Sequence, residues 1–113
     1  MSKLASPDIE KLERRSEQVA AILALIANPA RLRILCHLAR EEMQVGRLAE
    51  AVGLSQSALS QHLAKLRAGG AVETRRDRQA IHYRLADGEV RAIMDSLYDI
   101  FCKPDEGGET DSL

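Results

Sequence analysis

Aromatic residues are nearly absent from this chain of 113 residues, which has no tryptophan, two tyrosines and one phenylalanine. Any hydrophobic core must therefore consist of leucine, isoleucine, valine and alanine. Long apolar runs are missing too, since the longest, residues 19–27, is far too short to span a bilayer. The first fifteen residues carry both signs of charge, unlike a secretory signal peptide. These absences predict a single cytoplasmic domain.

Signatures of catalysis are also lacking. The sequence has no glycine-rich phosphate loop and no paired carboxylates in an apolar setting. Cys36 and His37 are adjacent, so on a helix their side chains diverge and cannot form a nucleophile–base pair. His37, His62 and His82 lie on different predicted elements, without the spacing of metal ligands. The sequence therefore predicts no enzyme, no cofactor and no metal site.

An excess of one charge sign is absent as well, because the formal net charge is −1. The charges are unevenly distributed, however. Residues 31–84 hold ten Lys and Arg against five Asp and Glu, whereas residues 85–102 and 103–113 each sum to −3. Local sign matters more than the total for contact with a polyanion, so the middle of the chain is the candidate nucleic-acid-binding part.

A helix-turn-helix pattern occupies residues 47–67, RLAEAVGLSQSALSQHLAKLR. Gly53 suits the sharp turn, because glycine adopts a positive φ without a Cβ clash, and Ser55 suits the N-cap of the second helix. Leucines recur at i, i+4 and i+7 on the inner face of that helix. Its outer face carries polar groups suited to base edges and phosphates: Gln56, Ser57, Ser60, Gln61 and Lys65. We predict a DNA-recognition helix here, and an ordinary solvated face is the alternative.

A β-hairpin is predicted downstream of this pattern. Its strands are residues 71–75 and 80–85, and residues 76–79 form the turn. Arg76 and Arg78 give the turn a basic tip that would reach a phosphate backbone or the minor groove of DNA. A solvated hairpin tip is the alternative interpretation.

Further helices are predicted on both sides. The first begins at Ser6-Pro7-Asp8 and runs continuously to about residue 26, with apolar residues in alternating steps of three and four that favour subunit pairing over packing within one domain. Asn28-Pro29 caps a second helix at residues 30–39, residues 41–44 form a loop, and a last helix spans residues 87–102. The predicted organisation has three parts. Residues 1–7 form a flexible N-terminus, residues 8–102 form a DNA-binding and dimerisation domain, and residues 103–113 form an acidic disordered tail.

The order of these elements resembles the ArsR/SmtB family of winged-helix repressors. The resemblance covers about residues 10–102 and is carried by NPARLRIL, LSQSALSQHLAKLRAGGAV and HYRL, which begin at Asn28, Leu54 and His82. It implies a mainly α fold with a two-stranded β wing, a winged helix-turn-helix that forms a homodimer through its first and last helices. By the same resemblance, the polar face of the recognition helix enters the major groove of double-stranded DNA, and the dimer reads an inverted-repeat operator.

The metal sites of that family are not matched. Its thiolate sensors have Cys-Val-Cys where this chain has Gln44-Val45-Gly46. At the other site, on the last helix, Asp87 is retained but Glu89 stands where the family has histidine, and the later positions fall near Ile100 and Lys103. The resemblance therefore implies no metal sensing.

The two cysteines, Cys36 and Cys102, allow two interpretations: small buried apolar residues, or a redox or ligand pair. Their positions resemble the sulfide-responsive BigR/SqrR-type branch of the family. In that branch, two cysteines react with persulfides to form a disulfide or polysulfide bridge, DNA is released, and sulfide-detoxification genes are expressed. Arginines at i−3 and i+4 from Cys36 favour its thiolate, so we expect Cys36 to attack and Cys102 to resolve. The alternative is a repressor of the same type with inert cysteines and another inducer, such as a general oxidant.

Overall fold

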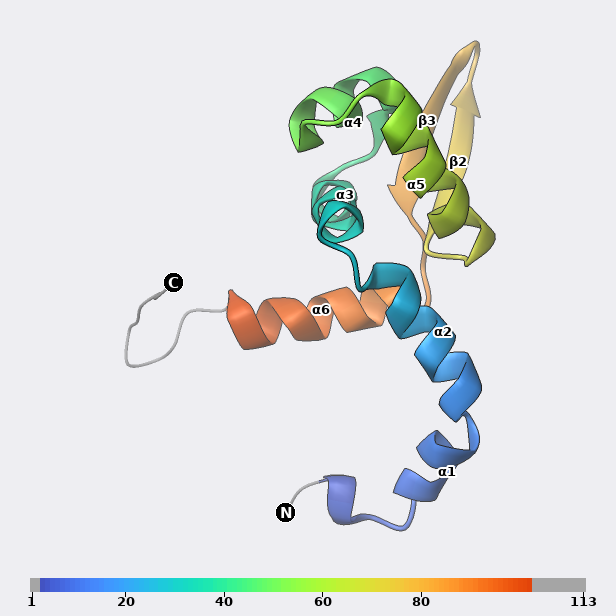
Figure 1. Cartoon of the computed structure of the whole chain (residues 1–113), viewed down its shortest axis with the longest axis vertical. Helices are drawn as coiled ribbons and strands as arrows, with labels where there is room; N and C mark the ends of the chain where they lie inside the picture. The colour runs from blue at the N-terminus through green and yellow to red at the C-terminus, as the bar shows by residue number, and fades with distance from the viewer. Residues whose placement is uncertain (1–2, 103–113) are drawn as a thin grey trace.

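The computed structural model describes residues 3–102, so the predicted acidic tail at 103–113 lies outside the described residues. The elements run η1 (Lys3–Ala5), α1 (Ile9–Arg14), α2 (Ser16–Ile26), α3 (Pro29–Arg40), β1 (Met43–Gln44), α4 (Val45–Val52), α5 (Gln56–Ala68), β2 (Val72–Asp77), β3 (Ala80–Leu85) and α6 (Glu89–Phe101). Helices α4 and α5 and the β2–β3 wing form one end of the molecule, and α1, α2 and α6 lie toward the other (Figure 1). The predicted winged helix-turn-helix is confirmed.

The caps and the turn of the helix-turn-helix form as predicted. The Asn28 side chain accepts a hydrogen bond of 3.1 Å from the Arg31 N–H at the start of α3. The Ser55 hydroxyl accepts one of 3.0 Å from the Ala58 N–H at the start of α5. Gly53 ends α4 in the left-handed conformation, with φ 75°. Backbone chemistry at these positions therefore fixes how α4 turns into α5.

The hydrophobic core lies beneath the recognition helix. Leu59, Leu63 and Leu66 of α5 are at most 1% exposed, as their spacing predicts. They pack in one cluster with fully buried side chains of α3 and α4, and with strand residues such as Leu85. Burying the inner face of α5 in this way leaves its polar face directed outward.

The predicted two-stranded wing is confirmed, and a third strand that was not predicted joins it, so the strand order is β1-β3-β2. β2 and β3 form the expected antiparallel hairpin. The extra strand pairs Met43 with Tyr83, in a segment predicted to be a loop. Met43 is 6% exposed, and burial of its side chain places this short segment beside β3. Two residues are too few to show a strand periodicity in the sequence.

The first predicted helix is also not continuous, because α1 ends at Arg14 and α2 begins at Ser16. Arg15, between them, has φ −104° and ψ 22°, outside the helical region. The Ser16 hydroxyl donates to the Glu13 carbonyl and so competes with the helical backbone for that acceptor. Helix α1 buries no residue, so no tertiary packing opposes the break.

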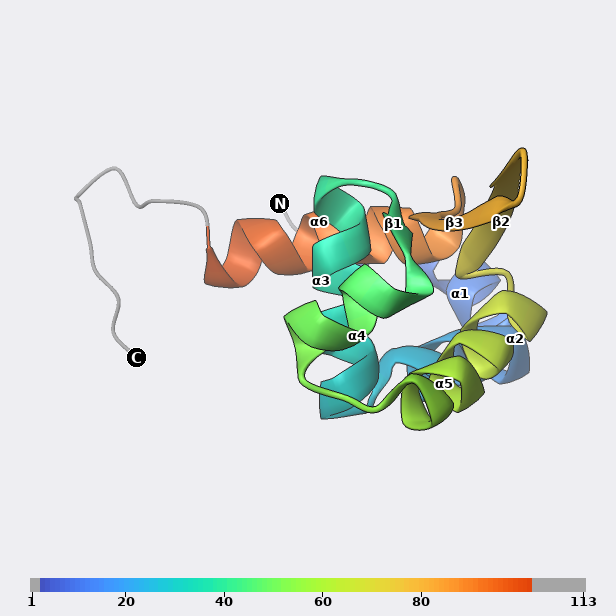
Figure 2. The same ribbon diagram turned by 90° about the horizontal axis from the view of Figure 1, so that it is seen from above.

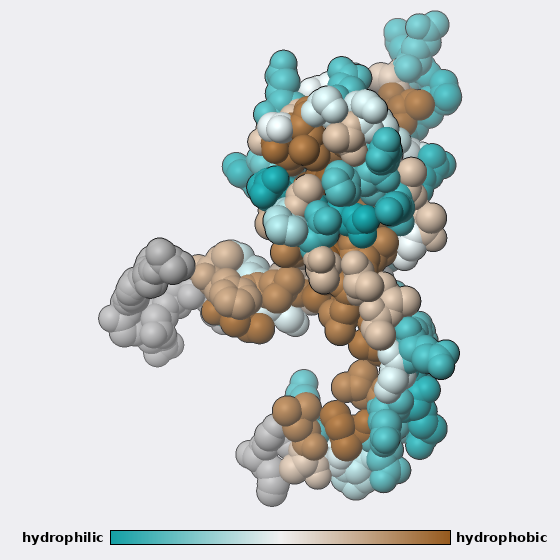
Figure 3. Space-filling model, in the orientation of Figure 1, coloured by the Kyte–Doolittle hydropathy of each residue, from teal (hydrophilic) through white to brown (hydrophobic). Residues whose placement is uncertain are grey.

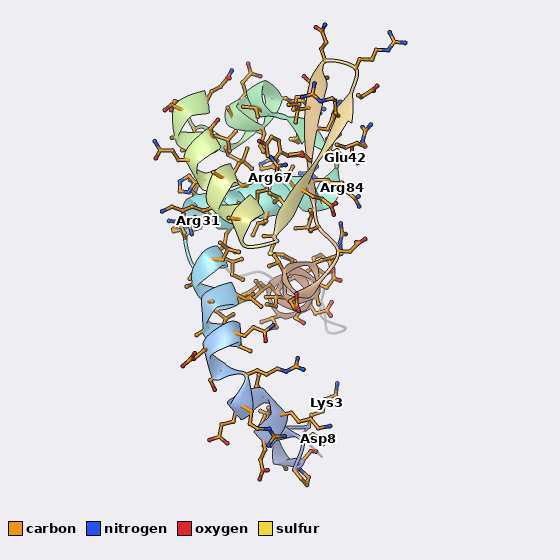
Figure 4. The ribbon with its side chains drawn as sticks, turned by 90° about the vertical axis from the view of Figure 1, so that its right-hand side faces the viewer. Lys3, Asp8, Arg31, Glu42, Arg67 and Arg84 are labelled. Atoms are coloured by element: carbon orange, nitrogen blue, oxygen red, sulfur yellow. The ribbon has the colours of Figure 1, made fainter. Side chains whose placement is uncertain are left out.

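Two contacts tie α2 to the end of the molecule that holds α4, α5 and the wing. Arg31 donates from Nη1 to the Leu25 carbonyl at 3.2 Å and from Nε to His62 Nδ1 of α5 at 3.3 Å (Figure 4). Gly69, just after α5, packs so closely that a Cβ there would lie 2.5 Å from Leu25 Cδ2. These contacts join α2 to the middle of α5, through Arg31 and His62, and to the residue that follows its C-terminus, through Leu25 and Gly69.

Candidate nucleic-acid interface

The polar face of α5 is exposed, and Figure 2 shows where α5 and the wing lie in the molecule. The five predicted reading residues all lie on it: Gln56, Ser57, Ser60, Gln61 and Lys65. No acidic residue occurs in α5. This face therefore presents hydrogen-bond donors and acceptors without a charge that repels phosphates, which is the chemistry needed to read base edges.

The wing tip differs in detail from its prediction. Arg76 and Asp77 continue β2, so the turn consists only of Arg78 and Gln79. Arg76 and Arg78 are both exposed, and neither is ion-paired within residues 3–102. Arg78 has φ 62°, in the left-handed region of the backbone. A residue other than glycine adopts this conformation at a cost of about 1–2 kcal/mol. The turn thus holds an arginine at a position that favours glycine.

An ion-pair network lies at the base of the wing. Glu42, just before β1, accepts from Arg75 Nε at 2.9 Å and lies 3.9 Å from Arg84 Nε (Figure 4). Arg84 in turn lies 3.9 Å from Glu73 of β2. The hydrogen bond from Arg75, with the charges of Arg75 and Arg84, holds the pKa of Glu42 below its usual value. Arg75 and Arg84 are therefore neutralised within the protein, unlike the arginines of the tip.

Replacing Glu42 by glutamine is expected to destabilise the protein near neutral pH but not in acid. The folded-state pKa of Glu42 is lowered, so its stabilising effect is present above the ordinary glutamate pKa of about 4.3 and is lost as the pH falls through the folded-state value. Urea unfolding midpoints over a pH series would measure this, with Glu50→Gln on α4 as the exposed control. If the difference in urea unfolding midpoint between the wild type and Glu42→Gln stays constant with pH, the prediction is contradicted.

A groove separates α5 from the wing and was not anticipated from the sequence. Its volume is about 470 Å³. It is lined by Ser60, Ala64, Arg67, Ala68 and, across from α5, Tyr83 of β3. The i, i+4, i+7 and i+8 spacing of the four helix residues places them on one side of α5, and this spacing is the only sign of the groove in the sequence. That the wing lies opposite them is shown only by the fold.

Both cysteines are exposed and are free thiols, so the interpretation as buried apolar residues is wrong. Cys36 lies on the exposed side of α3, and Cys102 directly follows α6. Helices α3 and α6 pack together, and α6 then projects beyond α3 (Figure 1). No group of three or more His, Cys, Asp or Glu side chains within residues 3–102 is placed to hold a metal ion.

The outer helices expose large apolar side chains. The α6 stripe of Val90, Met94, Leu97 and Phe101 runs from a buried first residue to a last one that is 78% exposed. Hydrophobic surface lies along α6 and along the side of α1 and α2 that faces it (Figure 3). In the described part of the chain, no single helix is long and apolar enough to cross a membrane, and the pair α2 and α3, which passes that test jointly, is bent by 86°. The exposed apolar surface of α6, α1 and α2 is more than the rest of this single domain covers, which is typical of a surface that binds another protein.

Comparison with known proteins agrees with this geometry. Residues 28–74 match the family described as "Bacterial regulatory protein, arsR family". Nodulation protein NolR of Rhizobium meliloti is 51% identical over 98 residues, covering 87% of this chain and 76% of NolR. Transcriptional activator HlyU of Vibrio cholerae is 40% identical over 104 residues, covering 92% of this chain and 96% of HlyU.

Solved structures show the same similarity. The transcriptional repressor BigR from Xylella fastidiosa superposes with a TM-score of 0.74 at 40% identity, covering 83% of this chain and 96% of BigR. A homodimeric winged helix-turn-helix DNA-binding domain from Mycobacterium bovis superposes with a TM-score of 0.69 at 33% identity, covering 84% and 85% of the two chains. These relatives are regulators of transcription and not enzymes.

Proposed function

Because the chain belongs to the arsR family of bacterial regulatory proteins and is a DNA-binding transcriptional regulator, we propose that it is a cytoplasmic repressor that senses reactive sulfur. It binds an inverted-repeat operator as a homodimer joined by α1, α2 and α6. Gln56, Ser57, Ser60, Gln61 and Lys65 contact the major groove, and Arg76 and Arg78 contact the backbone or minor groove. Reaction of Cys36 and Cys102 with a persulfide then releases the DNA and derepresses sulfide-detoxification genes.

The observation that carries the sensing proposal is that both thiols are exposed in the single chain and lie outside its hydrophobic core. Cysteine is among the most often buried residues, so two exposed cysteines in one small domain favour a chemical role over a packing role. Their positions also fit that role: Cys36 lies on α3, which packs against α4 and α5, and Cys102 lies at the end of an outer helix, α6. The resemblance of this pair to that of persulfide sensors, and the similarity of the fold to BigR, support the same assignment.

The chemistry balances with an organic persulfide as the oxidant. The Cys36 thiolate attacks the terminal sulfur of RS–SH, forming Cys36–S–SH and releasing RS⁻. The Cys102 thiolate then attacks the Cys36 sulfur, forming the Cys36–Cys102 disulfide and releasing HS⁻. If both thiols are persulfidated first, their condensation gives a trisulfide with release of H₂S. Either bridge ties α3 to the end of α6 and changes the spacing of the two recognition helices in the dimer, which weakens operator binding.

Fluorescence anisotropy on the protein's own promoter DNA tests this proposal. We expect persulfide to weaken binding by the wild type by roughly 5–150-fold, the usual range of allosteric coupling, and to leave Cys36→Ser and Cys102→Ser unaffected. Mass spectrometry of the treated protein counts the sulfur atoms in the bridge. Wild-type protein that keeps its affinity after persulfide treatment would overturn the proposal. Equal release by hydrogen peroxide would instead identify a general oxidant sensor.

A further inference from the structure

The cations of the DNA-reading end divide into two classes. Within residues 45–85, Arg47, Arg75 and Arg84 are ion-paired, with acceptors 3.2, 2.8 and 3.9 Å away. In the same segment, the remaining cations have no carboxylate partner: Lys65, Arg67, Arg76 and Arg78. An exposed arginine without an internal partner keeps all its donors for an external anion. The α5 face and the wing tip account for three of the four, which leaves Arg67 without an assigned role.

Arg67 lies in the groove between α5 and the wing. Figure 4 labels it between the two elements, and it lines the groove of about 470 Å³ together with Ser60, Ala64, Ala68 and Tyr83. The small side chains on the α5 side leave the groove open beside the guanidinium. On the opposite wall, the Tyr83 phenol adds a second hydrogen-bond donor. The groove therefore combines a fixed positive charge with room for an anionic group.

The position of the groove indicates what would occupy it. When a recognition helix lies in a major groove about 12 Å wide, the two sugar–phosphate backbones that border that groove run along its flanks. The groove borders the polar face of α5 on the side toward the wing, where Ser60, one of the proposed base-reading residues, lines it beside Arg67. One DNA backbone must pass there if α5 and the wing tip are to contact the same duplex.

We propose that Arg67 binds a phosphate of the DNA backbone in the groove between α5 and β3, and so sets the depth and register of the recognition helix. This inference rests on the DNA-binding function proposed above and adds a residue that positions the helix without reading bases. The guanidinium suits this role, since its planar fork can donate two parallel hydrogen bonds to one phosphate. A role limited to stabilising the negative C-terminal end of α5 is the competing explanation, because Arg67 lies in its last turn.

Anisotropy titrations over a salt series separate these explanations. On a labelled duplex of about three helical turns, Arg67→Gln should weaken binding by roughly tenfold. The slope of log K against log salt should become shallower by about 0.9 per subunit. The loss should be equal on promoter DNA and on a duplex of unrelated sequence, because phosphates carry no sequence information. Arg67→Lys should restore the slope, and Arg33→Gln, at an exposed arginine of α3 that does not line the groove, should leave it unchanged.

Four results would overturn the assignment. An unchanged slope with a lowered Tm would show that Arg67 only stabilises the end of α5. A loss confined to promoter DNA would show that Arg67 reads bases. A wild-type protein without salt-dependent binding to any duplex would overturn the DNA interface itself, whereas normal wild-type binding with an unaffected Arg67→Gln variant overturns the role of Arg67 alone.

Discussion

Replacing Phe101 by glutamate is expected to convert the proposed homodimer into monomers and to abolish tight operator binding. Phe101 is 78% exposed in the single chain, at the end of an apolar stripe that starts with the buried Val90. Burial of such a side chain in a dimer contributes about 1.5–3 kcal/mol, and the substitution removes it from both subunits. A loss of about 3 kcal/mol or more raises the dimer dissociation constant by roughly a hundredfold. Sedimentation velocity measures the mass, and anisotropy measures the DNA affinity.

A matched substitution on the same helix controls for the added charge. Ser96 is exposed on another side of α6, so Ser96→Glu adds the same carboxylate away from the stripe and should leave the dimer intact. Leu23→Glu, at an exposed leucine of α2, should weaken the dimer as Phe101→Glu does. A Phe101→Glu protein that sediments as a dimer with wild-type stability would show that subunits pair through another surface.

Replacing Leu63 by alanine should lower the free energy of unfolding by about 2–5 kcal/mol, because it opens a cavity in a close-packed core. Leu63 is 1% exposed at the centre of the inner face of α5. A domain of this size is usually stable by only about 5–15 kcal/mol, so the variant would approach the threshold of unfolding at physiological temperature. Urea unfolding followed by circular dichroism measures the change.

The volume-conserving substitution Leu63→Met provides the control. It should cost less than about 1.5 kcal/mol, since methionine fills nearly the same space. DNA binding by Leu63→Ala should weaken in proportion to the unfolded fraction and recover at low temperature or with an uncharged stabilising osmolyte. A free-energy loss no larger than that of Leu63→Met would show that α5 is not anchored through this residue.

The sequence predicted those features that depend on neighbouring residues. The caps at Asn28 and Ser55 and the turn at Gly53 follow from local backbone chemistry, and all three form as expected. The inner leucines of α5 follow from helical periodicity. Local chemistry also explains one error, because Ser16 breaks the first helix through a hydrogen bond that its apolar pattern did not reveal.

Features that depend on distant residues were not accessible in the same way. Strand β1 forms because Met43 is buried beside Tyr83, forty residues later. The pairing of Glu42 with Arg75 joins segments that the sequence separates by 33 residues. The exposure of Cys36 depends on which side of α3 the core covers. Apolar residues precede and follow Cys36 in the sequence of this helix, so the sequence alone does not show whether Cys36 faces the core or the solvent. Tertiary packing decides each of these cases.

The left-handed backbone of Arg78 has a consequence for how this protein can be altered. The substitution Arg78→Gly removes the conformational penalty at the wing tip, so the folded chain should gain thermal stability, but it also removes a cation that the proposed interface places against DNA. Selection for heat resistance alone would therefore favour glycine at position 78 and lower the affinity for DNA. A library screened for stability would recover glycine here, and a library screened for gene silencing would recover arginine or lysine.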